Sequence, residues 1–157
     1  MKTFNINVPV EVLGFDELNA SESALVDSAK QATYRSYAPY SNFNVGAAIE
    51  LGNGEIVPGS NQENAAFSSG TCAERSACFY AHARYPDTDF RRIAVAARDR
   101  SGDFIENPIP PCGSCRQSLL EYETLAGHPV EVLLVGRNCV YRLPSVTSLL
   151  PLSFTEF

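Results

Sequence analysis

The sequence predicts an α/β fold, a three-layer α/β/α sandwich around a mixed sheet of about five strands. Helix-like and strand-like segments alternate in the order helix, hairpin, helix, strand, helix, strand. Strands separated by helices favour a sheet that is covered on both faces. The chain has 157 residues, of which 45% are apolar. This length and composition are typical of one domain with one core, so we expect residues 1–157 to form a single domain.

The first half of the chain predicts one helix and one hairpin, with the helix at 21–36 and strands at 45–51 and 55–58. Ser21 is the expected N-cap of the helix, whose apolar residues recur on one face. The two strands are joined by Gly52-Asn53-Gly54, a strong hairpin signal. Residues 1–20 precede these elements as an N-terminal extension to which the sequence assigns no role.

The second half predicts helices at 71–84 and 113–124 and strands at 92–98 and 130–135. Good helix formers fill the first of these helices, and Pro86 closes it. Three prolines (Pro108, Pro110 and Pro111) hold an extended approach to Cys112.

Charge and composition exclude several classes of partner. The net charge of -6 repels phosphate backbones, and no run of Lys and Arg offsets it, so nucleic acid is not an expected partner. No apolar segment approaches the roughly 20 residues needed to cross a bilayer. Residues 1–10 lack the basic start and apolar core of a signal peptide. We therefore expect a cytoplasmic protein whose five cysteines serve as thiols or metal ligands.

Cys112 and Cys115 form a Cys-x-x-Cys pair at the start of a predicted helix. Both sulfurs can bind one ion there, and exposed helix amides stabilise thiolates. A redox pair needs no third ligand, a structural zinc site needs four protein ligands, and a catalytic zinc site needs three with one position left for water. Cys72, at the start of another predicted helix, is the candidate third ligand.

The presence or absence of a fourth ligand decides between the two zinc sites. Cys78 would point about 120° away from Cys72 around a regular helix, and His82 would lie about 15 Å along its axis. Neither can therefore share an ion with Cys72. Cys139 remains open as a ligand, although a small buried apolar residue is the favoured interpretation.

Glu74 favours the catalytic alternative, because a structural zinc has no use for an extra carboxylate. Zinc turns water into hydroxide near neutral pH, and a neighbouring carboxylate can take that proton and return it to the substrate. An ion of charge +2 with three thiolates carries a net charge of about -1, so charge must be withdrawn from it. The helix N-termini can do this, and so can Arg75 on the same helix face as Cys72, with Arg116 as a competing candidate.

Five ordered motifs extend this pattern from about Ser36 to Phe154. They are YAPYSNFNVGAA (37–48), NQENAAF (61–67), CAERSA (72–77), PCGSCRQ (111–117) and LLPLSF (149–154). In these motifs the chain resembles the zinc-dependent cytidine deaminases, most closely their small homotetrameric form with three cysteine ligands. The resemblance implies a cytidine deaminase-like fold and one Zn²⁺ per subunit. It also implies hydrolytic deamination of cytidine and deoxycytidine to uridine and deoxyuridine, with release of ammonia, in pyrimidine salvage.

The resemblance also implies a role for each matching residue. Zinc would be bound by Cys72, Cys112 and Cys115, and protons would be carried by Glu74. Substrate contacts within the chain would come from Phe43, Asn61, Glu63 and Ala73. Neighbouring subunits would complete the shared active sites with Ala65, Phe67 and Phe154. A carboxylate at 63 that accepts from the 3′-hydroxyl would repel a 3′-phosphate and so select a free nucleoside. Phe67 stands where relatives usually have tyrosine, so a hydroxyl contact to the sugar is absent.

Two alternatives stay open. One is deamination of another cytosine nucleoside, such as blasticidin S, on the same scaffold. The other is a non-enzymatic structural zinc-binding module. Asn61 and Glu63, as sugar contacts, favour cytidine over the first alternative, while Glu74 and the apparent lack of a fourth ligand argue against the second.

Overall fold

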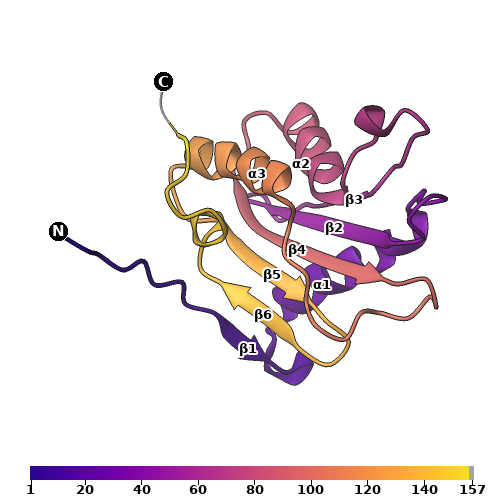
Figure 1. Cartoon of the computed structure of the whole chain (residues 1–157), viewed down its shortest axis with the longest axis horizontal. Helices are drawn as coiled ribbons and strands as arrows, with labels where there is room; N and C mark the ends of the chain where they lie inside the picture. Colours follow the sequence, from indigo (N-terminus) through magenta and orange to yellow (C-terminus); the bar gives the residue numbers. More distant parts are fainter. Residues whose placement is uncertain (156–157) are drawn as a thin grey trace.

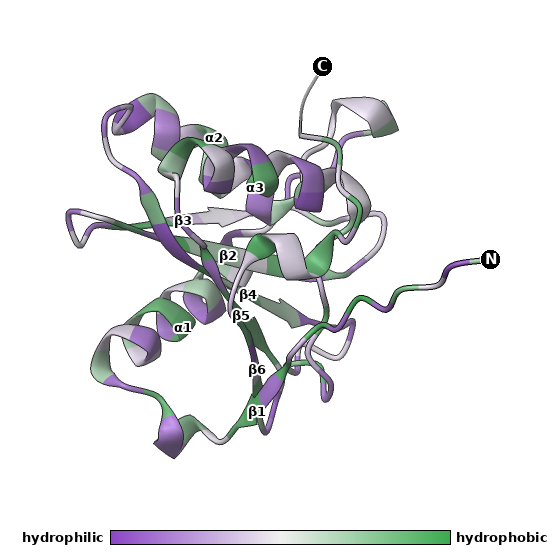
Figure 2. Cartoon of the chain, turned by 90° about the vertical axis from the view of Figure 1, so that its left-hand side faces the viewer, coloured by the Kyte–Doolittle hydropathy of each residue, from purple (hydrophilic) through white to green (hydrophobic). Residues whose placement is uncertain are grey.

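The computed structural model describes residues 1–155 and confirms the three-layer α/β/α architecture. Helix α1 covers one face of the sheet, while α2 and α3 lie side by side on the other (Figure 2). The helices are α1 (Ala20–Ala32), α2 (Ala73–Arg84) and α3 (Gly113–Ala126). Within the described range no helix is long and apolar enough to span a membrane. The last two residues of the predicted domain, 156 and 157, lie outside the described part.

The sheet is mixed and has six strands in the order β1-β6-β5-β4-β2-β3 (Figure 1). The strands are β1 (Glu11–Leu13), β2 (Asn44–Leu51), β3 (Ile56–Ser60), β4 (Phe90–Arg98), β5 (Glu131–Val135) and β6 (Val140–Leu143). Only β4 and β5 pair in parallel, whereas the other four pairs are antiparallel. Strands β1 and β6 were not predicted, because three or four residues are too few for an alternating pattern to stand out in the sequence.

Alternate residues of the central strands feed two cores. On β4, Ile93 and Val95 pack in the core beneath α2 and α3, while Ala94 and Ala96 pack against α1. The small side chains let α1 lie close to the sheet, and a Cβ atom on Gly46 of β2 would come within 2.2 Å of a backbone oxygen of α1. On β4, therefore, large apolar residues face α2 and α3 while small ones face α1, and both faces are buried.

The predicted N-cap of α1 was wrong by two residues. Asn19 caps the helix, its Oδ1 accepting from the amide of Glu22 at 3.0 Å, while the Glu22 carboxylate accepts from the Asn19 amide at 2.8 Å. This reciprocal pair is a capping box, which satisfies two amides instead of one. Ser21 lies inside the first turn, where its hydroxyl donates to Glu50 at 2.6 Å.

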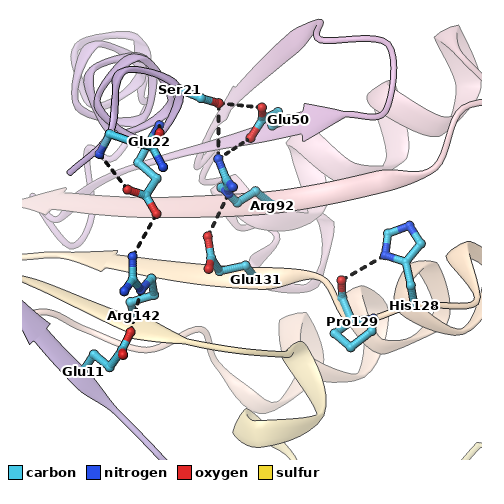
Figure 3. A network of polar contacts seen from close by, with 10 residues as sticks. Glu11, Ser21, Glu22, Glu50, Arg92, His128, Pro129, Glu131 and Arg142 are labelled. Carbon is cyan, nitrogen blue, oxygen red and sulfur yellow. Dashed lines mark hydrogen bonds and ion pairs between the residues drawn. The ribbon is translucent and has the colours of Figure 1, made fainter.

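Two arginine side chains of the sheet form ion pairs with carboxylates of neighbouring strands and of α1 (Figure 3). Arg142 of β6 contacts Glu11 of β1 at 2.6 Å and the buried Glu22 of α1 at 3.1 Å. Arg92 of β4 contacts two further carboxylates, those of Glu50 and Glu131. Strand β1 is therefore held to β6 by the ion pair between Glu11 and Arg142 as well as by backbone pairing.

Strand β3 and helix α2 approach each other closely at Gly59. A Cβ atom there would lie 2.4 Å from the amide nitrogen of Ala77 and 2.7 Å from the carbonyl oxygen of Ala73. Backbone atoms cannot move aside as a flexible side chain can, so the helix itself would have to shift.

We expect Gly59→Ala to lower the free energy of unfolding by about 3 kcal/mol, near the upper end of the usual cost of overpacking. Chemical denaturation measures this change. Gly113→Ala is the matched control, because nothing lies within 4 Å of the added methyl group, and it should be neutral or slightly stabilising. Equal stability of the two variants would contradict the close approach of β3 and α2.

Candidate active site

Two helices begin at the same place, and each begins at a cysteine. Cys72 is the N-cap of α2 and Cys112 is the N-cap of α3, and both have extended backbone angles. Cys115 lies in the first turn of α3 and is fully buried. The helix N-termini therefore direct their free amides and positive dipole ends toward the sulfurs, which favours thiolates.

The three sulfurs converge on a common point. The Sγ atoms of Cys72, Cys112 and Cys115 all lie within 4.8 Å of one another, and those of Cys72 and Cys112 are 3.9 Å apart. A tetrahedral zinc ion with bonds of about 2.3 Å separates its sulfur ligands by about 3.8 Å. The donor set and the spacing therefore fit a zinc ion bound by three cysteines.

Within residues 1–155 no fourth side chain joins this cluster. Cys78 is fully buried in the core, where burial raises the pKa of its thiol to about 12 and keeps it inert. The ring of His82 packs against Tyr122 with centroids 5.3 Å apart. Cys139 lies in the turn between β5 and β6, where its carbonyl accepts from the amide of Gly136 at 2.9 Å. The position of Cys139, which the sequence left open, is therefore outside the cluster.

The structure distinguishes between the two candidate arginines. The interaction of the Arg75 guanidinium with Cys72 and Cys115 raises its own pKa, and its buried Nε has no hydrogen-bond partner among the described residues. A hydrogen bond from Cys115, aided by Arg75 against the effect of burial, lowers the pKa of the Cys72 thiol to about 5. Arg116 instead donates to the carbonyl oxygens of Pro111 at 2.8 Å and Leu149 at 2.6 Å. The geometry supports Arg75 as the group that withdraws charge from the sulfurs.

Removing the Arg75 cation should weaken metal binding. We expect Arg75→Met to raise the zinc dissociation constant by about 10–100-fold, the usual effect of losing a partner of a metal ligand. Competition with a chromogenic chelator measures it. Arg84→Met, an exposed change in the last turn of the same helix, should leave the constant unchanged, and equal constants in both variants would exclude this role of Arg75.

Glu74 lies in the first turn of α2, and only 5% of its surface is exposed. Burial raises the pKa of its carboxyl, and the negative charge of Cys72 adds to this effect. A carboxyl group with a raised pKa can both accept and return a proton near neutral pH. Glu74 therefore has the burial, neighbours and acidity of a proton carrier beside the cysteine cluster.

A cavity of about 610 Å³ opens beside the cluster and Glu74. Five of the predicted substrate contacts line it, namely Phe43, Asn61, Glu63, Phe67 and Ala73. Several other lining residues had no substrate contact predicted for them, among them Tyr40, Ser41, Ile109 and Pro110. Tyr40 and Ser41 lie in the motif at 37–48, and Ile109 and Pro110 lie in the proline-rich approach to Cys112. These two segments were the only sequence features that pointed to the four residues.

Asn61 fixes the loop that carries Phe43. Its Nδ2 donates to the carbonyl oxygen of Phe43 at 2.9 Å, and its Oδ1 accepts from the amide of Val45 at 2.8 Å. Each of these atoms still has one hydrogen or lone pair for a ligand. Asn61 thus positions the aromatic ring as well as offering a polar contact in the cavity.

Glu63 is held by the same loop. Its carboxylate accepts from the amides of Tyr40 at 2.9 Å and Ser41 at 3.3 Å. A hydrogen bond with the Ser41 side chain and these amide bonds lower the pKa of the carboxyl, so it is ionised at neutral pH. The lining of the cavity therefore includes a fixed negative charge at Glu63.

Three predicted contacts were assigned to neighbouring subunits, and within one chain they lie on the surface. Ala65 is exposed and lies outside the lining of the cavity. Phe154 is 65% exposed, and its carbonyl oxygen accepts from Gln117 at 3.0 Å. Phe67 is 96% exposed and borders the cavity of its own chain.

Comparisons with known proteins agree with this geometry. The family model described as the cytidine and deoxycytidylate deaminase zinc-binding region matches residues 19–126. A cytidine deaminase of Halalkalibacterium halodurans is 37% identical over 131 residues, which is 83% of this chain and 92% of that protein. One of Sporosarcina psychrophila is 36% identical over 84% of this chain and 90% of its own. The crystal structure of cytidine deaminase from Burkholderia pseudomallei superposes with a TM-score of 0.70 at 39% identity, covering 83% of this chain and 97% of that chain.

Proposed function

The chain belongs to the family of zinc-binding cytidine and deoxycytidylate deaminases, and from this premise we propose that it converts free cytidine and deoxycytidine to uridine and deoxyuridine. The observation that carries the proposal is the buried Glu74 carboxyl, which lines a cavity large enough for a nucleoside together with Cys72 and Cys112 of the three-sulfur cluster. A structural zinc site has neither the extra carboxylate nor the cavity.

The proposed reaction is a hydrolysis in which the C4–N4 bond of cytosine breaks and a C4–O bond forms. Zinc held by Cys72, Cys112 and Cys115 supplies the Lewis acidity that makes water a nucleophile. Glu74 accepts the proton that this water loses and delivers it to ring nitrogen N3, then moves a second proton to the departing amine. Ammonia leaves and uridine remains, so one water is consumed for each substrate.

We assign the part of the cavity that Asn61 and Glu63 line to the sugar. Asn61 and Glu63 offer an amide and a carboxylate to the 3′-hydroxyl, while Phe43 lines the space for the base. Because Glu63 is ionised, a 3′-phosphate in the same place would meet a like charge. These residues support a free nucleoside rather than a nucleic-acid strand as substrate.

We further propose that the active protein is a cytoplasmic homotetramer with shared active sites. The exposed aromatic side chains of Phe67 and Phe154 support this, since burying a ring of that size in an interface would contribute about 1.5–3 kcal/mol. In such a tetramer Ala65 and Phe67 would come from one neighbour and Phe154 from another.

Loss of ultraviolet absorbance on adding cytidine tests the activity. We expect turnover of cytidine and deoxycytidine, with cytosine, dCMP and blasticidin S as comparison substrates at equal concentration. Slow or absent turnover of all three comparison substrates supports a nucleoside deaminase. Turnover of dCMP alone, or of blasticidin S alone, would assign a different substrate to the same site.

A further inference from the structure

An N-terminal arm, residues 2–10, runs outward from the edge of the sheet (Figure 1). Apolar and polar residues alternate along it, and the pattern continues into β1. The apolar positions are all exposed, namely Phe4 (75%), Ile6 (48%), Val8 (40%), Val10 (45%) and Val12 (63%). In an extended chain alternate side chains point to the same side, so these five form one continuous apolar stripe. A stripe of this length is typical of a strand that packs against another surface.

The arm leaves its own sheet for a physical reason. Strand β1 pairs with β6 in a register that sets Glu11 opposite Arg142 and Leu13 opposite Val140. Continued by two residues, this register would set Pro9 opposite Pro144. Neither proline has an amide hydrogen to donate, so the ladder ends there and the arm cannot extend it along β6.

The outer edge of β1 offers a place for a strand. Strand β1 is the end strand of the sheet and pairs only with β6 among residues 1–155. Its ion pair between Glu11 and Arg142 fixes it to the body. Edge strands with free backbone groups readily pair with another chain. The opposite edge, β3, carries Pro58 and the tightly packed Gly59, which make it a poorer partner.

Charge identifies a second copy of this chain as the occupant. Residues 1–10 contain Lys2 and no acidic residue, so they carry a formal charge of +1. Since the whole chain carries -6, the remaining residues carry -7. If the arm pairs antiparallel with β1 of a second copy about a two-fold axis at Pro9, Ile6 lies opposite Val12, and the outer end of each arm passes beside the segment that follows β1 in the other copy. That segment contains the exposed acidic residues Asp16 and Glu17. Lys2 at the outer end of each arm would then lie near a negative charge of its partner.

We propose that the arm is a self-association element, which pairs antiparallel with β1 of a second copy and buries the apolar stripes of both arms in one interface. The match to the family model begins at residue 19, so the arm lies outside the part of the chain that carries the proposed function. None of the cavity-lining residues belongs to the arm, β1 or β6. The interface therefore adds an assembly contact without taking part in the chemistry.

Paired substitutions on the two sides of the arm test this interface in the full chain. Ile6→Asn with Val8→Asn removes the centre of the apolar stripe, while Asn5→Ser with Asn7→Ser changes only the other side. Sedimentation velocity should show association weakened by at least about 100-fold in the first variant, which loses four apolar contacts per pair of chains, and by less than about threefold in the second. Turnover per subunit should stay unchanged in both, because the arm joins homotetramers whose shared active sites stay intact, and this separates the test from that of the proposed function.

A charge exchange tests which partner is bound. Lys2→Glu should weaken association, and adding Asp16→Lys should restore it, since the pair would again have opposite signs across the interface. In the wild-type protein the amides of residues 3–8 and 10 should be protected from hydrogen exchange. Unprotected arm amides, or unchanged sedimentation of the Ile6→Asn and Val8→Asn variant, would overturn the proposal. Protection that persists in a monomeric species would show that the arm packs on its own chain and would overturn it as well.

Discussion

Glu74→Gln is expected to keep one zinc ion per chain and to lose turnover of cytidine by at least about 10³-fold. The side chain keeps its size and lies beside the sulfur cluster without belonging to it, so metal binding should persist. An amide cannot accept and return protons, and loss of a single positioned acid–base group usually costs about 10²–10⁴-fold. Here one carboxyl is assigned several proton transfers, which places the loss at the upper end.

The physical state of Glu74 gives this prediction a second readout. Because burial raises the pKa of the carboxyl, ionising it in the folded protein costs free energy. A neutral glutamine avoids that cost, so the variant should be at least as stable as the wild type in chemical denaturation. Glu121→Gln, an exposed change on α3, is the matched control and should keep full turnover. Turnover of Glu74→Gln within tenfold of the wild type would contradict the assigned role.

Cys112→Ala is expected to lose zinc, all measurable turnover and part of its stability. Its sulfur is one of three in the cluster, and two sulfurs on different helices hold zinc far more weakly than three. The cluster also joins the N-termini of α2 and α3, so metal binding and folding are coupled there. Metal analysis, turnover and thermal unfolding measure the three effects, and a chelator added to the wild type should lower its unfolding temperature in the same direction.

Cys139→Ala is the control for this prediction, because Cys139 lies in the turn between β5 and β6 and outside the cluster. It should keep zinc, turnover and the wild-type response to chelator. Retention of a full zinc ion in Cys112→Ala would remove Cys112 from the ligand set. Loss of zinc in Cys139→Ala would show that a fourth cysteine takes part.

Local sequence determines the parts of the fold that were predicted well. Helix α3 begins at its predicted residue, Gly113, and α2 begins at Ala73, two residues after its predicted start, because good helix formers fill α2 and prolines bound both segments. The hairpin between β2 and β3 was predicted from Gly52-Asn53-Gly54, and Gly54 does adopt a positive φ of 87°. These features depend on a few neighbouring residues, so no long-range contact was needed to infer them.

The features that the sequence did not reveal depend on contacts between distant segments. Strand β1 is specified by its pairing with β6 and by the ion pair from Arg142 to Glu11, which lie 131 residues apart. The same holds for Glu123 of α3, whose carboxylate accepts from the amides of Val130 and Val146 at 2.8 Å and so joins three segments. A glutamate on a helix carries no local sign of such partners.

In the candidate site, too, features that depend on neighbouring residues could be predicted, whereas features that depend on contacts between distant segments could not. Three cysteines and Glu74 could be grouped from spacing because each lies at a helix start, where the backbone fixes its direction. The anchoring of Glu63 by the amides of Tyr40 and Ser41 could not, since any residue supplies a backbone amide. The choice between Arg75 and Arg116 likewise required the three-dimensional contacts, which place Arg116 on two carbonyl oxygens.

X-ray absorption at the zinc edge of the wild-type protein tests the central claim most directly. The claim is that three cysteine sulfurs hold a catalytic zinc and leave one position for water. We expect three sulfur neighbours at about 2.3 Å and one oxygen neighbour at about 2.0–2.2 Å. Four sulfur neighbours would describe a closed structural site and would contradict the proposed deaminase chemistry.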